Sequence, residues 1–289
     1  DHRLGANEAP PAILSVYLGD QLEKVFTDIK EGNIHTSELG GEMDLGLSQI
    51  LKFERDPGDR NRTSPFAFTG NRFEFWAVGS SQSVSGPLVA MNTLLADSLD
   101  WIAGKLETEL GAGASQADAV VSVLRALMLE HGNVVFGGDG YSEEWHRAAV
   151  EERGLKNIPT TADALPALRE ASVVELFSST GVLSPLELES RFEVYAEQYI
   201  LSIEVEAKLV IDMARTLIYP AATTYLADLS GTAQSLSAMG VELDNAVAKA
   251  VAGQINSMGA AVDSLAEALA SEDFSSTEEH MQFCANEIL

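Results

Sequence analysis

One run of sequence decides the fold class: LESRFEVYAEQYILSIEVEAKLVIDMARTL, residues 188–217. Apolar residues recur in it at steps of three and four, the spacing that places side chains along one face of an α-helix. The members of this stripe are Phe192, Tyr195, Tyr199, Ile203, Ala207, Val210, Ala214 and Leu217. The run predicts one long helix that Pro220 stops or kinks, because proline lacks the backbone N–H that a helix interior uses.

A second stripe of the same kind follows the first. Its members are Leu243, Val247, Val251, Ile255, Met258, Val262, Leu265 and Leu269. Two consecutive long amphipathic helices pack most economically as an antiparallel pair. Shorter helical patterns extend from Pro87 to about Leu110 and from Gln116 to about Glu130. Most of the chain is therefore expected to be helical.

The composition excludes several classes of protein. The 289 residues carry a net charge of −26, which argues against a nucleic-acid partner, and 46% of them are hydrophobic, enough for a sizeable core. The most apolar long stretch, residues 205–229, contains charged residues and Pro220, so no membrane span is expected. The one cysteine, Cys284, cannot form an internal disulfide, which favours a reducing, cytoplasmic location. The chain opens at Asp1 without an initiating Met, as expected for a piece of a longer protein.

Strand-forming residues are concentrated in the first 80 residues. Residues 71–78, NRFEFWAV, favour a strand, whose side chains alternate between two faces. Phe73 and Phe75 then share one face, while Arg72, Glu74 and Trp76 share the other. A carboxylate beside a cation on a face with apolar neighbours makes Glu74 a candidate cleft residue.

A short window, which consists of the loop before this strand and the first residues of the strand, concentrates positive charge. The five basic residues of the window are Lys52, Arg55, Arg60, Arg62 and Arg72. Such a cluster can bind an anionic ligand, because guanidinium groups form paired hydrogen bonds with phosphates and carboxylates. Local ion pairs with Glu54, Asp56 and Asp59 are the alternative, and the sequence alone leaves both open.

Several motifs, in order along the chain, resemble the type III class of glutamine synthetase. They are DHRLGANEAPP (1–11), DRNRTSPFAFTGNRFEF (59–75), VGSSQS (78–83), GYSEEW (140–145), GVLS (181–184) and HMQFC (280–284). The resemblance implies an α+β fold: a fragment of the glutamine synthetase catalytic domain, with a few strands in the first 80 residues and long antiparallel helices after residue 184. It divides the chain into the C-terminal part of that domain, 1–135, and a mainly helical C-terminal region, 136–289.

The resemblance also implies an activity. In this family, ATP phosphorylates the side-chain carboxylate of glutamate, and ammonia then displaces phosphate to give glutamine, with Mg²⁺ or Mn²⁺ as the metal. The implied partners are glutamate, ammonia and ATP, in a ring-based homo-oligomer, a dodecamer, with no nucleic acid and no membrane. Most metal and nucleotide ligands of the family would precede Asp1, so this chain alone is expected to be inactive.

Site residues follow from the resemblance by position. Arg3 would contact substrate glutamate, and Glu8 would lie in the flap that guards the ammonium site. Arg62 would face the phosphate, with Arg60 in a supporting role, and Glu74 would bind the metal.

Structural roles stay open for these residues. Arg3 and Glu8 would then lie in an exposed turn, and Arg62 would pair with Asp59. Glu74 would pair with Arg72.

Trp76 departs from the family pattern, which usually has an arginine two residues after the metal glutamate. An indole cannot grip a carboxylate as a guanidinium does. The alternative function is therefore a noncatalytic paralogue, oligomer-forming or regulatory, that keeps the fold but has lost the substrate arginine.

Overall fold

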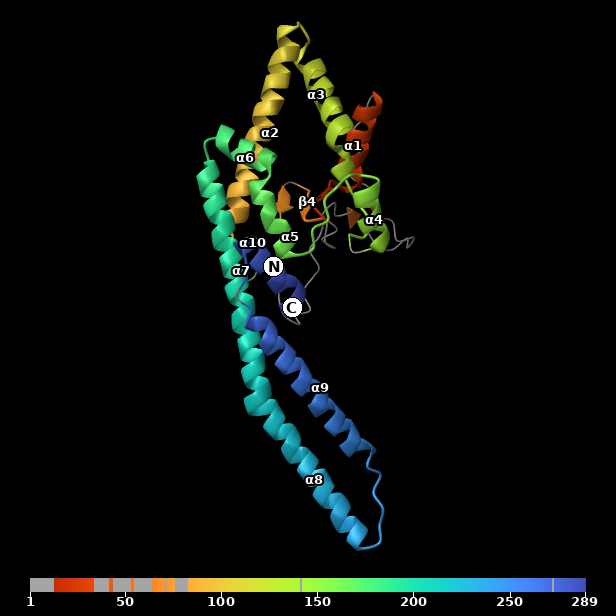
Figure 1. The fold of residues 1–289 in the computed structure, drawn as a ribbon. Coiled ribbons are helices and arrows are strands. Elements are labelled where there is room, and N and C mark those ends of the chain that lie inside the picture. Colours follow the sequence, from red (N-terminus) through yellow and green to blue (C-terminus); the bar gives the residue numbers. More distant parts are fainter. Residues whose placement is uncertain are drawn as a thin grey trace. The chain divides into compact units, whose positions relative to one another are not determined.

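The computed structural model describes residues 13–33, 42–43, 53–54, 64–70, 72–75, 83–140, 142–271 and 273–289. These residues form two compact units (Figure 1). The first contains the described residues up to Thr160 together with Ser172–Ser184, and the second contains Thr161–Ala171 and Pro185–Leu289. The domains predicted from the sequence, 1–135 and 136–289, are not the same as these compact units, and they stay a prediction.

A small mixed sheet lies in the first unit. Its strands, in the order β1-β4-β5, are β1 (Val16–Tyr17), β4 (Phe66–Phe68) and β5 (Phe73–Phe75). β1 pairs with β4 in parallel, and β4 pairs with β5 as an antiparallel hairpin. A separate antiparallel pair joins β2 (Glu42–Met43) to β3 (Phe53–Glu54). Strands thus occur in the first 80 residues, as predicted.

Helices make up most of the remainder of the first unit. They are α1 (Gly19–Glu31), α2 (Ser85–Gly111), α3 (Gln116–His131), α4 (Glu143–Glu151) and α6 (Ala171–Ser179). The helices expected at 87–110 and 116–130 are confirmed as α2 and α3. Ser115 caps α3 by accepting a hydrogen bond from the Asp118 N–H, and Ser142 caps α4 in the same way. Such caps satisfy N–H groups that have no partner within the helix.

The second unit is built around one long helical run. Its elements are α5 (Thr161–Ala164), a 3₁₀ turn (Leu165–Arg169), α7 (Pro185–Met213), α8 (Tyr219–Ala238), α9 (Ala246–Leu269) and α10 (Thr277–Phe283). α9 folds back along α8 and contacts both α7 and α8 (Figure 1). The predicted antiparallel pair of long helices is therefore confirmed.

Pro220 does not stop the long helix. One π-helical turn, Ala214–Ile218, joins α7 to α8, and Pro220 occupies the first turn of α8. In a π-helical turn the backbone hydrogen bonds join residues five apart, where those of an α-helix join residues four apart. The missing N–H of Pro220 is tolerated here because proline fits the first turn of a helix.

The core of the second unit gathers residues from α5, α7, α10 and the C-terminal turn that follows it. The buried cluster contains Ala162, Phe192, Ala196, Tyr199, Ile200, Ile203, Ala207, Met281, Cys284 and Ile288. This confirms the α7 stripe at Phe192, Tyr199, Ile203 and Ala207, while Tyr195 is partly buried. Beyond this cluster Ala214 is buried, whereas Val210 and Leu217 are exposed. In α9, Ile255 and Val262 are buried.

The described part of the chain thus has the α+β character expected from the sequence, mostly helical with short strands near its start. None of the described helices combines the length and the apolar character that crossing a membrane requires.

Candidate functional site

Glu74 is the predicted site residue whose surroundings the structure describes. It lies at the centre of β5, opposite Ala67 of β4, while Phe75 pairs with Phe66 and Phe73 pairs with Phe68. Side chains directly opposite each other in an antiparallel pair point to the same face. Glu74 therefore shares its face with Ala67, which is buried.

The other face of this hairpin is aromatic. The Phe66 ring stacks on Phe73 with centroids 5.2 Å apart and lies 6.3 Å from the ring of Phe75. Phe68 packs on Phe73 at 5.3 Å. The predicted alternation is confirmed for these residues: the phenylalanines lie on one side, and Glu74 lies on the other.

Glu74 forms an ion pair with Arg72 of the same strand face. Arg72 Nε and Nη2 both donate to Glu74 Oε1, at 2.9 and 2.6 Å. The two side chains are 70% and 49% exposed, so this pair contributes only about 0–1 kcal/mol to folding. The carboxylate is accessible, and the arginine that holds it requires little energy to displace.

Buried hydroxyl groups anchor the start of β4 to the rest of the unit. Ser15 Oγ donates to Ser64 Oγ at 2.8 Å, and Ser64 Oγ donates to the Phe136 carbonyl at 3.4 Å. The Phe136 N–H in turn donates to the Val16 carbonyl at 3.0 Å. Residues far apart in sequence thereby fix the strand that precedes Glu74.

Phe136 also connects the sheet to α4. Its ring stacks on Trp145 with centroids 3.6 Å apart, and the guanidinium of Arg153 lies over both rings. Arg153 Nη1 donates to the Val135 carbonyl at 2.8 Å. Trp145 and Ala149 are buried with Ile13 in a small core. The scaffold around the strands is therefore packed and hydrogen-bonded.

The other predicted site residues lie outside the described residues. These are Arg3 and Glu8 near the start of the chain and Arg60 and Arg62 in the basic loop. Trp76, which replaces the expected arginine, lies outside them as well. Their assembly around Glu74 stays a prediction.

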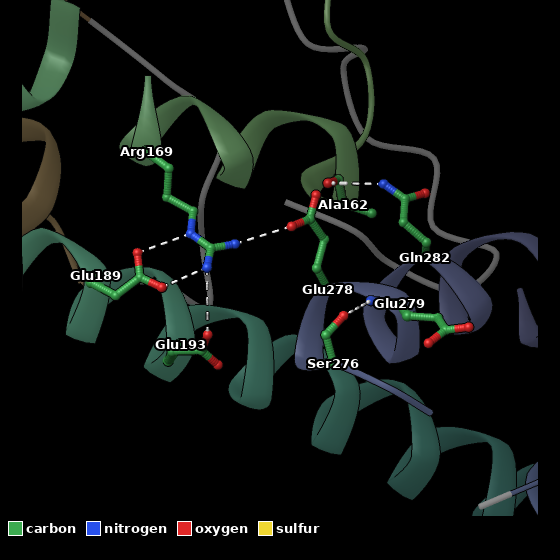
Figure 2. Close-up of polar contacts among 8 residues, drawn as sticks. All are labelled: Ala162, Arg169, Glu189, Glu193, Ser276, Glu278, Glu279 and Gln282. Carbon is green, nitrogen blue, oxygen red and sulfur yellow. Dashed lines mark hydrogen bonds and ion pairs between the residues drawn. The ribbon is translucent and has the colours of Figure 1, made fainter. Parts of the chain in front are cut away.

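A polar cluster in the second unit was not predicted from the sequence. Figure 2 shows Arg169, at the end of the 3₁₀ turn, reaching carboxylates on two helices. It forms a two-armed pair with Glu189 of α7, with Nη2–Oε1 at 2.5 Å and Nε–Oε2 at 2.9 Å. Its Nη1 donates to Glu278 of α10 at 3.0 Å, and Glu193 lies at 4.0 Å. In the sequence, the four-residue spacing of Glu189 and Glu193 indicates only that these two carboxylates share one face of a helix.

The ion pairs of this cluster hold parts of the second unit together. The hydrogen bond from Arg169 holds the pKa of Glu189 below its usual value, and the same bond raises the pKa of Arg169. The guanidinium also covers the buried Phe192 ring at 4.1 Å. Arg169 thus ties the turn before α6 to α7 and α10.

The start of α10 has its own cap beside this cluster. Ser276 Oγ accepts a hydrogen bond from the Glu279 N–H at 3.1 Å (Figure 2). Glu279 Oε2 accepts in return from the N–H and hydroxyl of Ser275, which lowers the pKa of Glu279. Gln282 Nε2 donates to the Ala162 carbonyl at 3.2 Å. These bonds fix α10 against α5.

Two buried groups of the second unit are core residues. Burial raises the pKa of the Cys284 thiol to about 11, so it stays protonated at neutral pH and is a poor nucleophile. Burial likewise raises the pKa of Tyr199 to about 12. Among the described residues, no group of three or more His, Cys, Asp or Glu side chains is arranged to hold a metal ion.

Comparison with known proteins relates the chain to one family. Residues 119–237 match a family model described as the glutamine synthetase C-terminal domain. The type-3 glutamine synthetase of Dictyostelium discoideum is 42% identical over 236 residues, which is 82% of this chain and 32% of that protein.

Two bacterial relatives give the same result. The glutamine synthetase of Bacteroides fragilis is 37% identical over 227 residues, covering 78% of this chain and 31% of its own length. The glutamine synthetase of Butyrivibrio fibrisolvens is 35% identical over 230 residues, which is 80% of this chain and 32% of that protein. The chain thus spans about a third of the length of the curated relatives it matches. These relatives give no support to the noncatalytic alternative.

Proposed function

Because this chain is a relative of the type III glutamine synthetases, we propose that it is part of an ATP-dependent glutamate–ammonia ligase. The observation that carries the proposal is the 42% identity to a type-3 glutamine synthetase over 82% of the chain. The reaction transfers the γ-phosphoryl group of ATP to the side-chain carboxylate of glutamate. Ammonia then attacks the acyl carbon and phosphate leaves, giving glutamine.

The proposed roles follow from the charges that this reaction creates. Arg3 binds the substrate glutamate, and Glu8 closes the ammonium site. Arg62, assisted by Arg60, faces the phosphoryl group, where negative charge accumulates and a guanidinium is the most effective partner. The three arginines each carry a positive charge toward an anionic group, and Glu8 carries a negative charge toward ammonium. A neutral substitution at each position therefore tests the proposed role.

Glu74 is the proposed metal ligand of this chain. Mg²⁺ is commonly held by one or two carboxylates together with substrate phosphates, a donor set to which an accessible glutamate can contribute. Its two contacts with Arg72 go to the same oxygen, Oε1. A bound Mg²⁺ or Mn²⁺ would neutralise charge on the nucleotide phosphates. The weak surface pair with Arg72 can open without a large loss of stability.

The setting of the enzyme is part of the same proposal. We infer a cytoplasmic homo-oligomer, a ring-based dodecamer as in the family, whose substrates are glutamate, ammonia and ATP. The buried single cysteine, Cys284, supports a reducing compartment. The 289-residue chain alone should make no glutamine, because most metal and nucleotide ligands of the family lie in segments that it does not contain.

The experiment is glutamine formation by the longer protein that carries this chain, with ATP, Mg²⁺, glutamate and ammonia. Glu74→Gln keeps the shape of the side chain and removes its charge, so the Mg²⁺ requirement should rise strongly. Arg72→Gln is the matched control, because it breaks the same ion pair and leaves the carboxylate in place. Equal effects of the two variants would show that Glu74 only pairs with Arg72, and absence of glutamine formation in the unaltered protein would overturn the proposed activity.

A further inference from the structure

A nearly uncharged hairpin forms the end of the second unit. This distal hairpin, residues 216–262, contains α8, the connection to α9 and most of α9 (Figure 1). Its 47 residues include four charged side chains, Asp228, Glu242, Asp244 and Lys249, with a net charge of −2. The other 242 residues carry 58 charged side chains and a net charge of −24. The hairpin therefore stands apart from the rest of a strongly acidic surface.

Apolar side chains are exposed at the tip of this hairpin. Met239 is 70% exposed, Val247 55%, Val241 50% and Leu243 42%. Exposed loop tips ordinarily carry small or polar residues. Val247 also belongs to the apolar stripe of α9, so the pattern that predicts burial extends onto a solvent-facing surface, whereas Leu243 lies in the connection before α9.

The two helices of the hairpin bury little of one another. No side chain of α8, all of whose residues are described, is buried, and within α9 only Ile255 and Val262 are. Farther back along the hairpin, Leu217 and Tyr225 are exposed as well. Two amphipathic helices close a dry core when a second pair packs on them as a four-helix bundle. The hairpin therefore leaves apolar side chains that a second pair of helices could cover.

We propose that the distal hairpin is a self-association surface, and that its partner is the same hairpin of a second copy of this chain. The charge distribution selects this partner. Two copies that each carry −26 repel wherever their acidic surfaces meet, and the repulsion is smallest where the charge is least. A basic partner would instead be attracted to the acidic remainder, since an uncharged hairpin offers it no complementary field.

The dimensions of the hairpin suit such a contact. A helix of 20 residues is about 30 Å long and, with side chains, about 10 Å wide, so one face of the hairpin covers about 600 Å² in projection. A stable interface buries about 800 Å² of accessible surface on each partner, and accessible area exceeds the projected area of a corrugated surface. A twofold axis would bring the same residues of both copies into contact. This inference deepens the proposed homo-oligomer and does not depend on catalysis.

The test is the association state of the 289-residue chain by analytical ultracentrifugation over a range of concentrations and salt. Because the hairpin is nearly uncharged, added NaCl should strengthen association by screening the repulsion between the acidic remainders. An interface held by opposite charges would weaken instead. A chain that stays monomeric at every concentration, or whose association weakens with salt, would overturn the proposal.

Charge insertion locates the interface. Met239→Glu with Val247→Glu places two carboxylates at exposed tip positions, where the folded monomer tolerates them, and should weaken association by about 100-fold or more, because each charge loses its water in the contact. Leu129→Glu with Leu186→Glu adds the same charge at positions 62% and 78% exposed elsewhere and should leave association within about threefold of the unaltered chain. Far-UV circular dichroism verifies that all variants fold.

Equal weakening by the two pairs of substitutions would mean that added charge acts through general repulsion, and no weakening by the tip pair would place the contact elsewhere. Either result overturns the proposal. Neither bears on glutamine formation, so the failure of this interface and the failure of the proposed activity are distinguishable.

Discussion

Truncation of Met281 in α10 should destabilise the second unit and leave the stability of the first unit unchanged. It is fully buried in the cluster formed with α5 and α7, which also contains the fully buried Phe192 and Cys284. Met281→Ala deletes the side chain beyond Cβ and leaves a cavity, because packed helices relax only in part. Substitutions of this kind cost about 2–5 kcal/mol.

The effect should be confined to the second unit. With an expected loss of about 3 kcal/mol and a urea dependence of about 2 kcal/mol per molar, the unfolding midpoint of this unit should fall by about 1.5 M. All three tryptophans, Trp76, Trp101 and Trp145, precede Thr161, so their fluorescence reports the first unit. That signal should keep its midpoint, while hydrogen exchange in α7 accelerates at lower urea.

Met213→Ala is the matched control for this experiment. Met213 ends α7 in the same unit and is 42% exposed, so its truncation should cost less than about 1 kcal/mol. The reasoning would be refuted by equal midpoints for the two variants, since α10 would then contribute no buried packing. It would also be refuted by a parallel shift in tryptophan fluorescence, since the units would then unfold as one.

The helices could be predicted because their signal is local. A step of three or four residues is a property of the helix itself, so the stripes of α7 and α9 are legible without knowledge of their partners. The same stripes predicted burial less well at their far ends. Val210, Leu217 and Val247 fit the pattern and are exposed, because burial depends on what packs against the helix and not on the helix alone.

The strands required more than local pattern. Alternation correctly separated the phenylalanines of β5 from Glu74, but the pairing of β1 with β4 joins residues about fifty positions apart. Nothing in the neighbourhood of either strand specifies that parallel register. The Ser15–Ser64 hydrogen bond, which fixes it, likewise joins side chains that are distant in sequence.

The candidate site was predicted from motif resemblance, and its physical environment could be read only in part. For Glu74 the sequence left metal binding and pairing with Arg72 as alternatives, and the ion pair exists at 2.6 Å. An exposed pair of this kind is compatible with either role, because a weak contact is readily exchanged for a ligand. Arg169 escaped prediction because its partners come from two helices that are adjacent only after folding.

Three further outcomes are expected. The purified 289-residue chain, supplied with ATP, Mg²⁺, glutamate and ammonia, should form no glutamine above background, and formation above background would contradict the assignment of most ligands to other segments. In the longer protein, Trp76→Arg should lower the KM for glutamate by about tenfold or more if an arginine there grips the substrate, since a charged hydrogen bond contributes about 1.5–3 kcal/mol; an unchanged KM would make Trp76 a packing residue. The last outcome concerns pH and Glu189, whose pKa in the folded chain is held below its usual value by Arg169. A carboxylate with a lowered pKa stabilises the fold above its unfolded pKa of about 4.3, and this stabilisation is lost as the pH falls through the folded pKa. The urea midpoint of the second unit should therefore exceed that of Glu189→Gln at about pH 7, and the difference should shrink toward zero as the solution is acidified below about pH 4. A difference that stays constant across this range would mean that the Arg169 contact is equally strong with a neutral partner, and that charge pairing is not what joins the turn to α7.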